Sequence, residues 1–156
     1  MAFIIIIVAA GLFGLLQIFK IKDKFAKVIN LMYAISIGVS LVPIPQIAID
    51  GFYLFGLTHL AVLFYVFHNE DFSNEKKGLM SMMALIQLAA TLFWLMNYPY
   101  QQIVFLLGLI TLAAFIFIVA KRIQDYKNEV GFLTVLAADG LIKAGTILIS
   151  LSSTTN

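Results

Sequence analysis

The chain has no cysteine, two histidines and three prolines among its 156 residues. The absence of cysteine excludes disulfide bonds, thiolate metal sites, iron–sulfur clusters and cysteine nucleophiles. His59 and His68 are too few for a metal site made of several histidines of one chain, so we expect no metal and no cofactor. Glycine-rich phosphate loops, HExxH and Gly-x-Ser-x-Gly are also missing. No motif specifies a reaction. Whether the protein is an enzyme stays open, with a non-enzymatic role favoured.

Charged residues are scarce as well. They make up 12% of the chain, against 62% for hydrophobic residues, and the mean hydropathy is +1.02. In an ordinary soluble domain roughly a quarter of the residues are charged. No polar stretch is long enough to form a separate soluble domain. The composition therefore predicts an all-α, polytopic transmembrane helical bundle, with residues 1–156 as a single integral membrane domain.

Basic residues are concentrated in three short segments. Nine of the ten lie in residues 20–27, 68–77 and 121–129. Lys and Arg are retained on the cytoplasmic side of membrane proteins, so these three loops are predicted to be cytoplasmic and the protein to be a multi-pass protein of the inner (cytoplasmic) membrane. Acidic residues are interleaved with the basic ones, which argues against nucleic acid and favours the lipid bilayer as the partner.

Six apolar segments are candidate spans, since a spanning helix needs about 20 residues. They are Ala2–Phe19, Ala26–Ile49, Gly51–Phe67, Gly78–Met96, Gln101–Ala120 and Gly131–Leu151. With all basic loops inside, the spans would form three hairpins with the N- and C-termini both outside. No basic residue precedes the first span, so we predict a retained helix rather than a signal peptide. Pro43 and Pro45 are expected to kink or end the second helix, and Asp50 is expected to cap the third.

Asp139 and Lys143 are the most unusual residues of the apolar segments. They lie near the middle of the sixth span, one helical turn apart and with the acid first, an order that favours an ion pair. Ionisable residues at this depth cost at least about 2.5 kcal/mol each and often have a function. The pair could relay protons or ions, contact a substrate or dock a charged residue of another subunit. The structural alternative is mutual neutralisation, with Lys143 extending towards the membrane surface.

His59, in the third span, is the remaining candidate functional residue. An unperturbed histidine titrates near neutral pH, which suits proton handling. The structural alternative is a hydrogen bond to a neighbouring helix. Other polar residues are expected to bond between helices; they are Gln17, Gln87, Thr91, Thr111 and Thr134. Small residues four positions apart predict close contact between helices; the pairs are Ala10 and Gly14, Ala34 and Gly38, Ser36 and Ser40, and Gly140 and Ala144.

The second basic segment also carries acids. Glu70, Asp71 and Glu75 lie beside Lys76 and Lys77. Mixed charge of this kind is typical of a solvated turn. We therefore expect these five side chains to face water.

The last span resembles the retinal-binding helix of microbial rhodopsins in Asp139-x-x-x-Lys143-x-Gly145. The resemblance would make Lys143 the attachment point of retinal and Asp139 part of its counter-ion. It covers one helix, which here would run from inside to outside, opposite to that family. The chain also lacks that family's Trp-x-x-Tyr-Pro before the last helix.

A second resemblance is to the YhhN-type lysoplasmalogenase membrane family. Gly56-Leu57-Thr58-His59-Leu60 is similar to its glycine-to-histidine helix, and the segment from Gly131 to Asp139 is similar to its later aspartate helix. The resemblance implies that His59 and Asp139 take part in hydrolysis of a lysolipid vinyl ether. That family has eight helices and an earlier Gly-Asp pair, neither of which is found in this sequence.

The small size, the lack of a soluble domain and the small-residue helix faces favour one function. This is a non-enzymatic subunit or accessory component of a larger membrane complex, with other membrane protein subunits as partners. A small transporter or ion- or proton-conducting protein that uses Asp139 and Lys143 is the first alternative. A membrane-embedded lipid hydrolase resembling the YhhN-type lysoplasmalogenases is the second.

Overall fold

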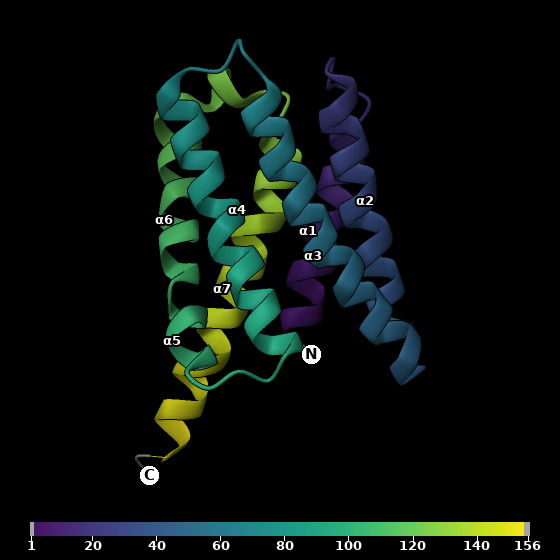
Figure 1. Ribbon diagram of the computed structural model, residues 1–156, viewed down its shortest axis with the longest axis vertical. Coiled ribbons are helices and arrows are strands. Elements are labelled where there is room, and N and C mark those ends of the chain that lie inside the picture. The colour runs from purple at the N-terminus through teal and green to yellow at the C-terminus, as the bar shows by residue number, and fades with distance from the viewer. Residues whose placement is uncertain (1, 155–156) are drawn as a thin grey trace.

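The computed structural model describes residues 2–154 as a bundle of helices, with no strand in that range (Figure 1). The helices are α1 (Ala2–Gln17), α2 (Lys24–Ser40), α3 (Pro45–His68), α4 (Asn74–Leu95), α5 (Gln101–Leu106), α6 (Gly108–Phe117) and α7 (Val130–Thr154). A short π-helix, η1 (Ile118–Arg122), and a 3-10 turn, η2 (Ile123–Tyr126), continue α6. The predicted all-α class is confirmed.

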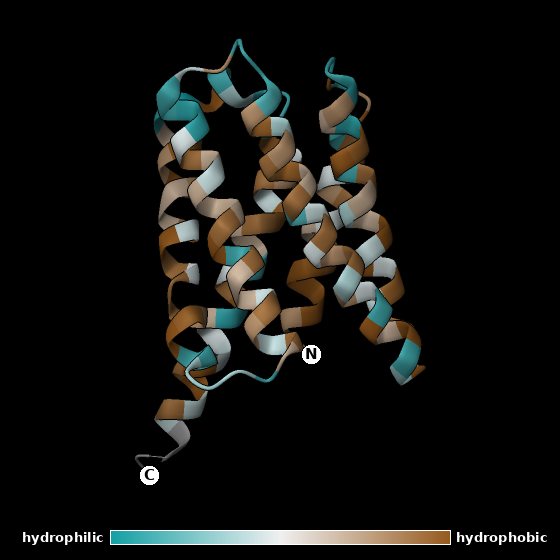
Figure 2. Cartoon of the chain, in the orientation of Figure 1, coloured by the Kyte–Doolittle hydropathy of each residue, from teal (hydrophilic) through white to brown (hydrophobic). Residues whose placement is uncertain are grey.

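α5 and α6 run in the same direction as parts of one continuous helix, and the other successive helices alternate in direction, so the connections gather at two ends of the bundle (Figure 1). Connections 18–23, 69–73 and 127–129 lie at one end, which we call the charged end. Connections 41–44 and 96–100 lie at the other, which we call the opposite end. Figure 2 shows hydrophilic residues gathered at the charged end and hydrophobic helices below it.

Contacts between distant segments hold the charged end together. The backbone N–H of Lys22 donates to Asn128 Oδ1 at 3.1 Å, which joins the first basic segment to the third. Arg122 Nη2 lies 3.2 Å from Glu75 Oε2, which joins the third segment to the second. The three basic segments of the sequence therefore meet on one side of the molecule.

Within residues 2–154, four helical segments have the length and hydropathy of a membrane-spanning helix. They are α3, α4, α7 and the continuous helix Gln101–Tyr126. The other two, α1 and α2, have 16 and 17 residues and are shorter than a typical span. These apolar helices are compatible with a small membrane protein. The count of six spans and their arrangement as three membrane hairpins stay predictions.

The boundary between the second and third predicted spans is wrong. α2 ends at Ser40 rather than Ile49, and α3 begins at Pro45 rather than Gly51. The Val-Pro-Ile-Pro run ends the helix, as expected, because proline lacks a backbone N–H and steers the preceding residue away from helical backbone. Pro45 then starts the next helix, where its missing N–H has no intrahelical partner to lose. Asp50 therefore lies inside α3 and does not cap it.

The central helix of the bundle is α7. It contacts α1, α2, α4, α5 and α6, and 56% of its span-length window is buried, against 28–33% for the other three spans. It meets α6 at two glycines, since a Cβ added to Gly108 would fall on the backbone of Gly140. The close helix contact predicted around Gly140 is confirmed, whereas the one predicted at Gly38 is wrong, since nothing lies within 4 Å of a Cβ added there.

A buried ion pair lies just inside the charged end. The Glu129 side chain is 1% exposed; its carboxylate accepts a hydrogen bond from the Tyr65 hydroxyl at 2.9 Å and pairs with Lys76 Nζ at 2.9 Å. Lys76 Nζ also donates to the Asp125 carbonyl at 2.7 Å and lies 4.0 Å from the centroid of the Phe72 ring. The expectation that Lys76 faces water is therefore wrong, whereas the three acids of its segment are exposed as expected.

Candidate functional site

Asp139 and Lys143 form an ion pair halfway along α7. Lys143 Nζ lies 2.5 Å from Asp139 Oδ2, and the two side chains are only 13% and 12% exposed. Lys143 Nζ also donates to Thr91 Oγ1 at 3.0 Å and to Gln87 Oε1 at 3.4 Å, both on α4. An ammonium group has three hydrogens, and three oxygens of this chain lie within hydrogen-bond distance of Lys143 Nζ. The charge of Lys143 is thus compensated without a partner protein.

The hydrogen bonds continue from α4 to α6. Gln87 Nε2 donates to Thr111 Oγ1 at 3.1 Å, and both side chains are fully buried. The expectation of interhelical bonds is therefore confirmed for Gln87, Thr91 and Thr111. It is wrong for Thr134, whose hydroxyl donates to the Val130 carbonyl of its own helix at 2.7 Å.

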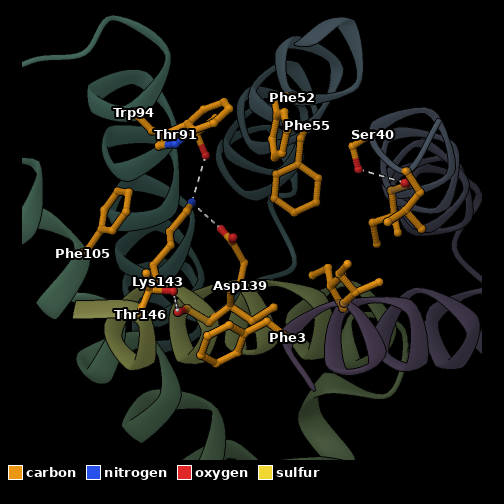
Figure 3. Close-up of a pocket in the computed structure, with 15 residues that line it drawn as sticks. Phe3, Ser40, Phe52, Phe55, Thr91, Trp94, Phe105, Asp139, Lys143 and Thr146 are labelled. Carbon is orange, nitrogen blue, oxygen red and sulfur yellow. Dashed lines mark hydrogen bonds and ion pairs between the residues drawn. The ribbon is translucent and has the colours of Figure 1, made fainter. Parts of the chain in front are cut away.

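The ion pair lies in the wall of a pocket of about 440 Å³. Residues of α1, α2, α3, α4, α5 and α7 line it, and most of the lining is apolar. Its aromatic members are Phe3, Phe52, Phe55, Trp94 and Phe105. Figure 3 shows these rings around Lys143 and Asp139, with Thr91 bonded to the ammonium group. A volume of this size lies within the roughly 300–1,000 Å³ typical of small-molecule sites.

Positions along the helices show where the pocket lies. Trp94 is one residue from the end of α4, and Phe3 is the second residue of α1; both termini are at the opposite end. Asp139 is nine residues from the start of α7, because 139 − 130 = 9, and that start is at the charged end. At 1.5 Å per residue, this places Asp139 about 14 Å from the charged end. The pocket therefore extends from the opposite end to the middle of the bundle.

On the charged-end side of Asp139 the interior is filled. Large apolar side chains there are 0% exposed: Met80, Phe132, Leu133 and Leu136. Tyr65 and the buried pair of Glu129 and Lys76 lie beyond them. The pocket is thus closed on one side, with Asp139 at its floor.

His59 lies at the same depth as Asp139 but is adjacent to the pocket-lining ring of Phe55. It is nine residues from the charged-end terminus of α3, because 68 − 59 = 9, and its side chain is fully buried. His59 Nδ1 lies 2.7 Å from the Phe55 carbonyl oxygen of its own helix, rather than bonding to another helix. The Phe55 ring, which lines the pocket, is 4.9 Å from the His59 ring between centroids. The structure therefore places His59 next to the pocket and not in its lining.

Tyr33 on α2 is the residue that sequence reasoning missed. It is fully buried, and its ring centroid lies 5.6 Å from that of His59 and 5.2 Å from that of Phe55. The Tyr33 hydroxyl and His59 Nε2 both have no hydrogen-bond partner in the described structure. The only signal in the sequence is the spacing of the buried face of α2, in which Tyr33 follows Ile29 at a four-residue interval.

The site combines apolar walls with a polar floor of zero net charge. Lys143 is bonded to Oδ2 of Asp139, which leaves Oδ1 available to accept a hydrogen bond. The arrangement suits a molecule that has an apolar body and a polar end, because each part meets surroundings of its own kind. No cluster of three or more potential metal ligands is present among residues 2–154.

No family model, curated protein or solved structure matches the chain. The function is therefore inferred from the geometry of the site.

Proposed function

We propose that this protein is an integral membrane protein that binds one amphipathic molecule, without transforming it, in the pocket between its helices. The apolar part of the molecule would lie against the aromatic lining, and its polar end would reach Asp139 and Lys143. The observation that supports this proposal is a pocket of about 440 Å³ whose floor carries the Asp139–Lys143 pair.

The surroundings of the pair favour this role over the two other uses of an intramembrane charge. A residue that docks a partner subunit must present its charge on the outer surface, whereas Asp139 and Lys143 are compensated inside the bundle. A transport path must continue across the molecule, whereas the interior beyond Asp139 is filled by side chains such as Phe132 and Leu136.

The single tryptophan of the chain provides a direct test. Trp94 lines the pocket, so a single-chain lipid with a nitroxide group should quench its fluorescence when bound there. The purified protein in mild detergent is titrated with this lipid. We expect saturable quenching, reversed by an excess of the unlabelled lipid.

Two substitutions on α7 separate the pocket from the detergent-facing surface. Thr146 lines the pocket, and Thr146→Phe should fill it and abolish the saturable quenching. Leu148 is 50% exposed and is not part of the lining, so Leu148→Phe should leave the quenching unchanged. Equal quenching in the wild type and in Thr146→Phe would contradict the proposal.

A second candidate function is that of an accessory subunit in a larger membrane complex. The short helices α1 and α2 support it, because a helix shorter than the bilayer can be accommodated by association with other membrane proteins. The test is the native mass of the tagged protein, extracted in mild detergent from its own host. Other polypeptides in the complex would support this candidate, and a chain of 17.3 kDa on its own would contradict it.

We further propose that the charged end faces the cytoplasm and that the pocket opens towards the outer side of the inner membrane. The supporting observation is that nine of the ten basic residues lie in the three segments that meet at this end.

A further inference from the structure

Three helices bring polar groups to one depth at the floor of the pocket. Tyr33, His59 and Asp139 are each nine residues from the charged-end terminus of their helices, since 33 − 24, 68 − 59 and 139 − 130 all equal nine. Equal rise along the helices places the three side chains in one layer. The Tyr33 and His59 rings also contact each other, with centroids 5.6 Å apart.

Each member of this layer has an unused hydrogen-bonding atom. The Phe55 carbonyl can only accept, so the Nδ1 atom of His59, 2.7 Å away, carries the proton. In the neutral ring the unpartnered Nε2 is then an acceptor. Asp139 Oδ1 is an acceptor too, and the unpartnered Tyr33 hydroxyl can accept or donate. A fully buried polar atom without a partner is costly, and two of these three atoms are fully buried.

Asp139 lines the pocket itself, whereas the other two members of the layer, Tyr33 and His59, adjoin it through Phe55. Phe55 contributes to the pocket lining, and its ring contacts the rings of both Tyr33 and His59, at centroid distances of 5.2 and 4.9 Å. A turn of the Phe55 ring would extend the pocket floor from Asp139 to His59. A polar group bound at Asp139 could then also reach Nε2.

We propose that the pocket is specific for a single-chain lipid whose uncharged head group carries hydroxyl groups, and that His59, Tyr33 and Asp139 bind these hydroxyls. The inference rests on the proposed function and names its ligand class. Hydroxyl groups fit because His59 and Asp139 offer acceptors and Tyr33 can act in either direction. An anionic head group does not fit, because Asp139 already compensates Lys143, whose Nζ has three oxygens of this chain within hydrogen-bond distance.

The test compares three probes that share one acyl chain: monooleoylglycerol, methyl oleate and oleate. Each displaces the nitroxide lipid from the full-length protein, and the fluorescence of Trp94 reports the displacement. We expect monooleoylglycerol to bind about tenfold more tightly than methyl oleate, because only its head group donates hydrogen bonds. Oleate should bind no better than methyl oleate.

Removing the Tyr33 hydroxyl tests whether the ligand binds to the layer of Tyr33, His59 and Asp139, because the substitution keeps the aromatic ring and its packing. Tyr33→Phe should weaken monooleoylglycerol binding by about threefold to tenfold and leave methyl oleate unchanged. The matched control is Tyr53→Phe on α3, because Tyr53 is 55% exposed and outside the pocket lining. It should change neither affinity.

The outcomes separate this inference from the proposed function. If no probe displaces the nitroxide lipid saturably, the proposed function fails. If all three bind equally, or if oleate binds most tightly, the proposed function stands and the hydroxyl specificity is wrong. If Tyr33→Phe alters all three affinities alike or none of them, the ligand does not reach the layer, and water fills the place assigned to its hydroxyl.

Discussion

Lys143 has two neutral hydrogen-bond partners, Thr91 and Gln87, and one charged partner, Asp139. The contribution of the charged partner to stability can therefore be measured by substitution. Asp139→Asn leaves the ammonium group buried beside Thr91 and Gln87 without a counter-charge, and Lys143→Met leaves the carboxylate unpaired. We expect each single substitution to lower the free energy of unfolding by about 3–5 kcal/mol, and the double substitution to cost much less than their sum. Unfolding in mixed detergent micelles measures all four proteins of this cycle.

The same double variant separates stability from binding. A protein that carries both Asp139→Asn and Lys143→Met should keep the fold, since no buried charge remains, but should lose the saturable quenching of Trp94. Full quenching in a stably folded double variant would show that the pair serves packing alone. Costs of the two single substitutions that simply add would show that the two side chains do not interact.

At the charged end, the adjacent residues Lys76 and Lys77 differ in whether they pair with a buried carboxylate. Lys76 is paired with Glu129, which is 1% exposed, whereas Lys77 takes no part in that cluster. We expect Lys76→Met to lower the free energy of unfolding by up to about 3 kcal/mol, because the Glu129 carboxylate loses its cation. Lys77→Met is the matched control and should change it by less than about 0.5 kcal/mol. Thermal unfolding of the two variants decides the matter, and equal midpoints would contradict the assigned role of Lys76.

At the scale of helices, the contact between α6 and α7 depends on the absence of side chains at Gly108 and Gly140. A Cβ on Gly108 would overlap backbone atoms of Gly140, which cannot move aside as a flexible side chain could. Gly108→Ala should therefore destabilise the protein by about 1–3 kcal/mol. Gly38 in α2 has nothing within 4 Å of the added atom, so Gly38→Ala should be stabilising by about 0.5–1 kcal/mol. Equal unfolding midpoints for Gly108→Ala and Gly38→Ala would contradict the close contact between Gly108 and Gly140.

Features that depend on neighbours in the chain could be predicted from the sequence. The helical class follows from long apolar segments, and the break after α2 follows from its two prolines. The Asp139–Lys143 pair follows from a four-residue spacing on one helix. The predicted position of that break is wrong, because apolar residues continue on both sides of the prolines and periodicity alone does not locate a helix end.

The pocket and its inner layer could not be predicted in this way. Phe3 and Phe105 are 102 residues apart in the sequence, since 105 − 3 = 102, and line one pocket with Asp139 only through the packing of α1 and α5 against α7. Tyr33 and Glu129 likewise look like ordinary residues of a helix and a loop. Their burial is a property of the assembled bundle, since it depends on which helices surround them.

For the whole molecule, the proposed orientation has the charged end in the cytoplasm, and the cysteine-free sequence makes this proposal testable. Single cysteines replace exposed residues at the two ends: Glu70→Cys and Lys127→Cys at the charged end, and Gln46→Cys and Tyr98→Cys at the opposite end. A membrane-impermeant maleimide is applied to spheroplasts, in which the outer face of the inner membrane is accessible and the membrane itself is unbroken. We expect labelling of Gln46→Cys and Tyr98→Cys only, because the basic connections are held in the cytoplasm. After membrane rupture, Glu70→Cys and Lys127→Cys should react as well.

The reverse pattern would place the pocket on the cytoplasmic side. If the two cysteines of one end differ in their labelling, not every helix spans the membrane. In that case α1 and α2 are the first helices to re-examine, because they have only 16 and 17 residues.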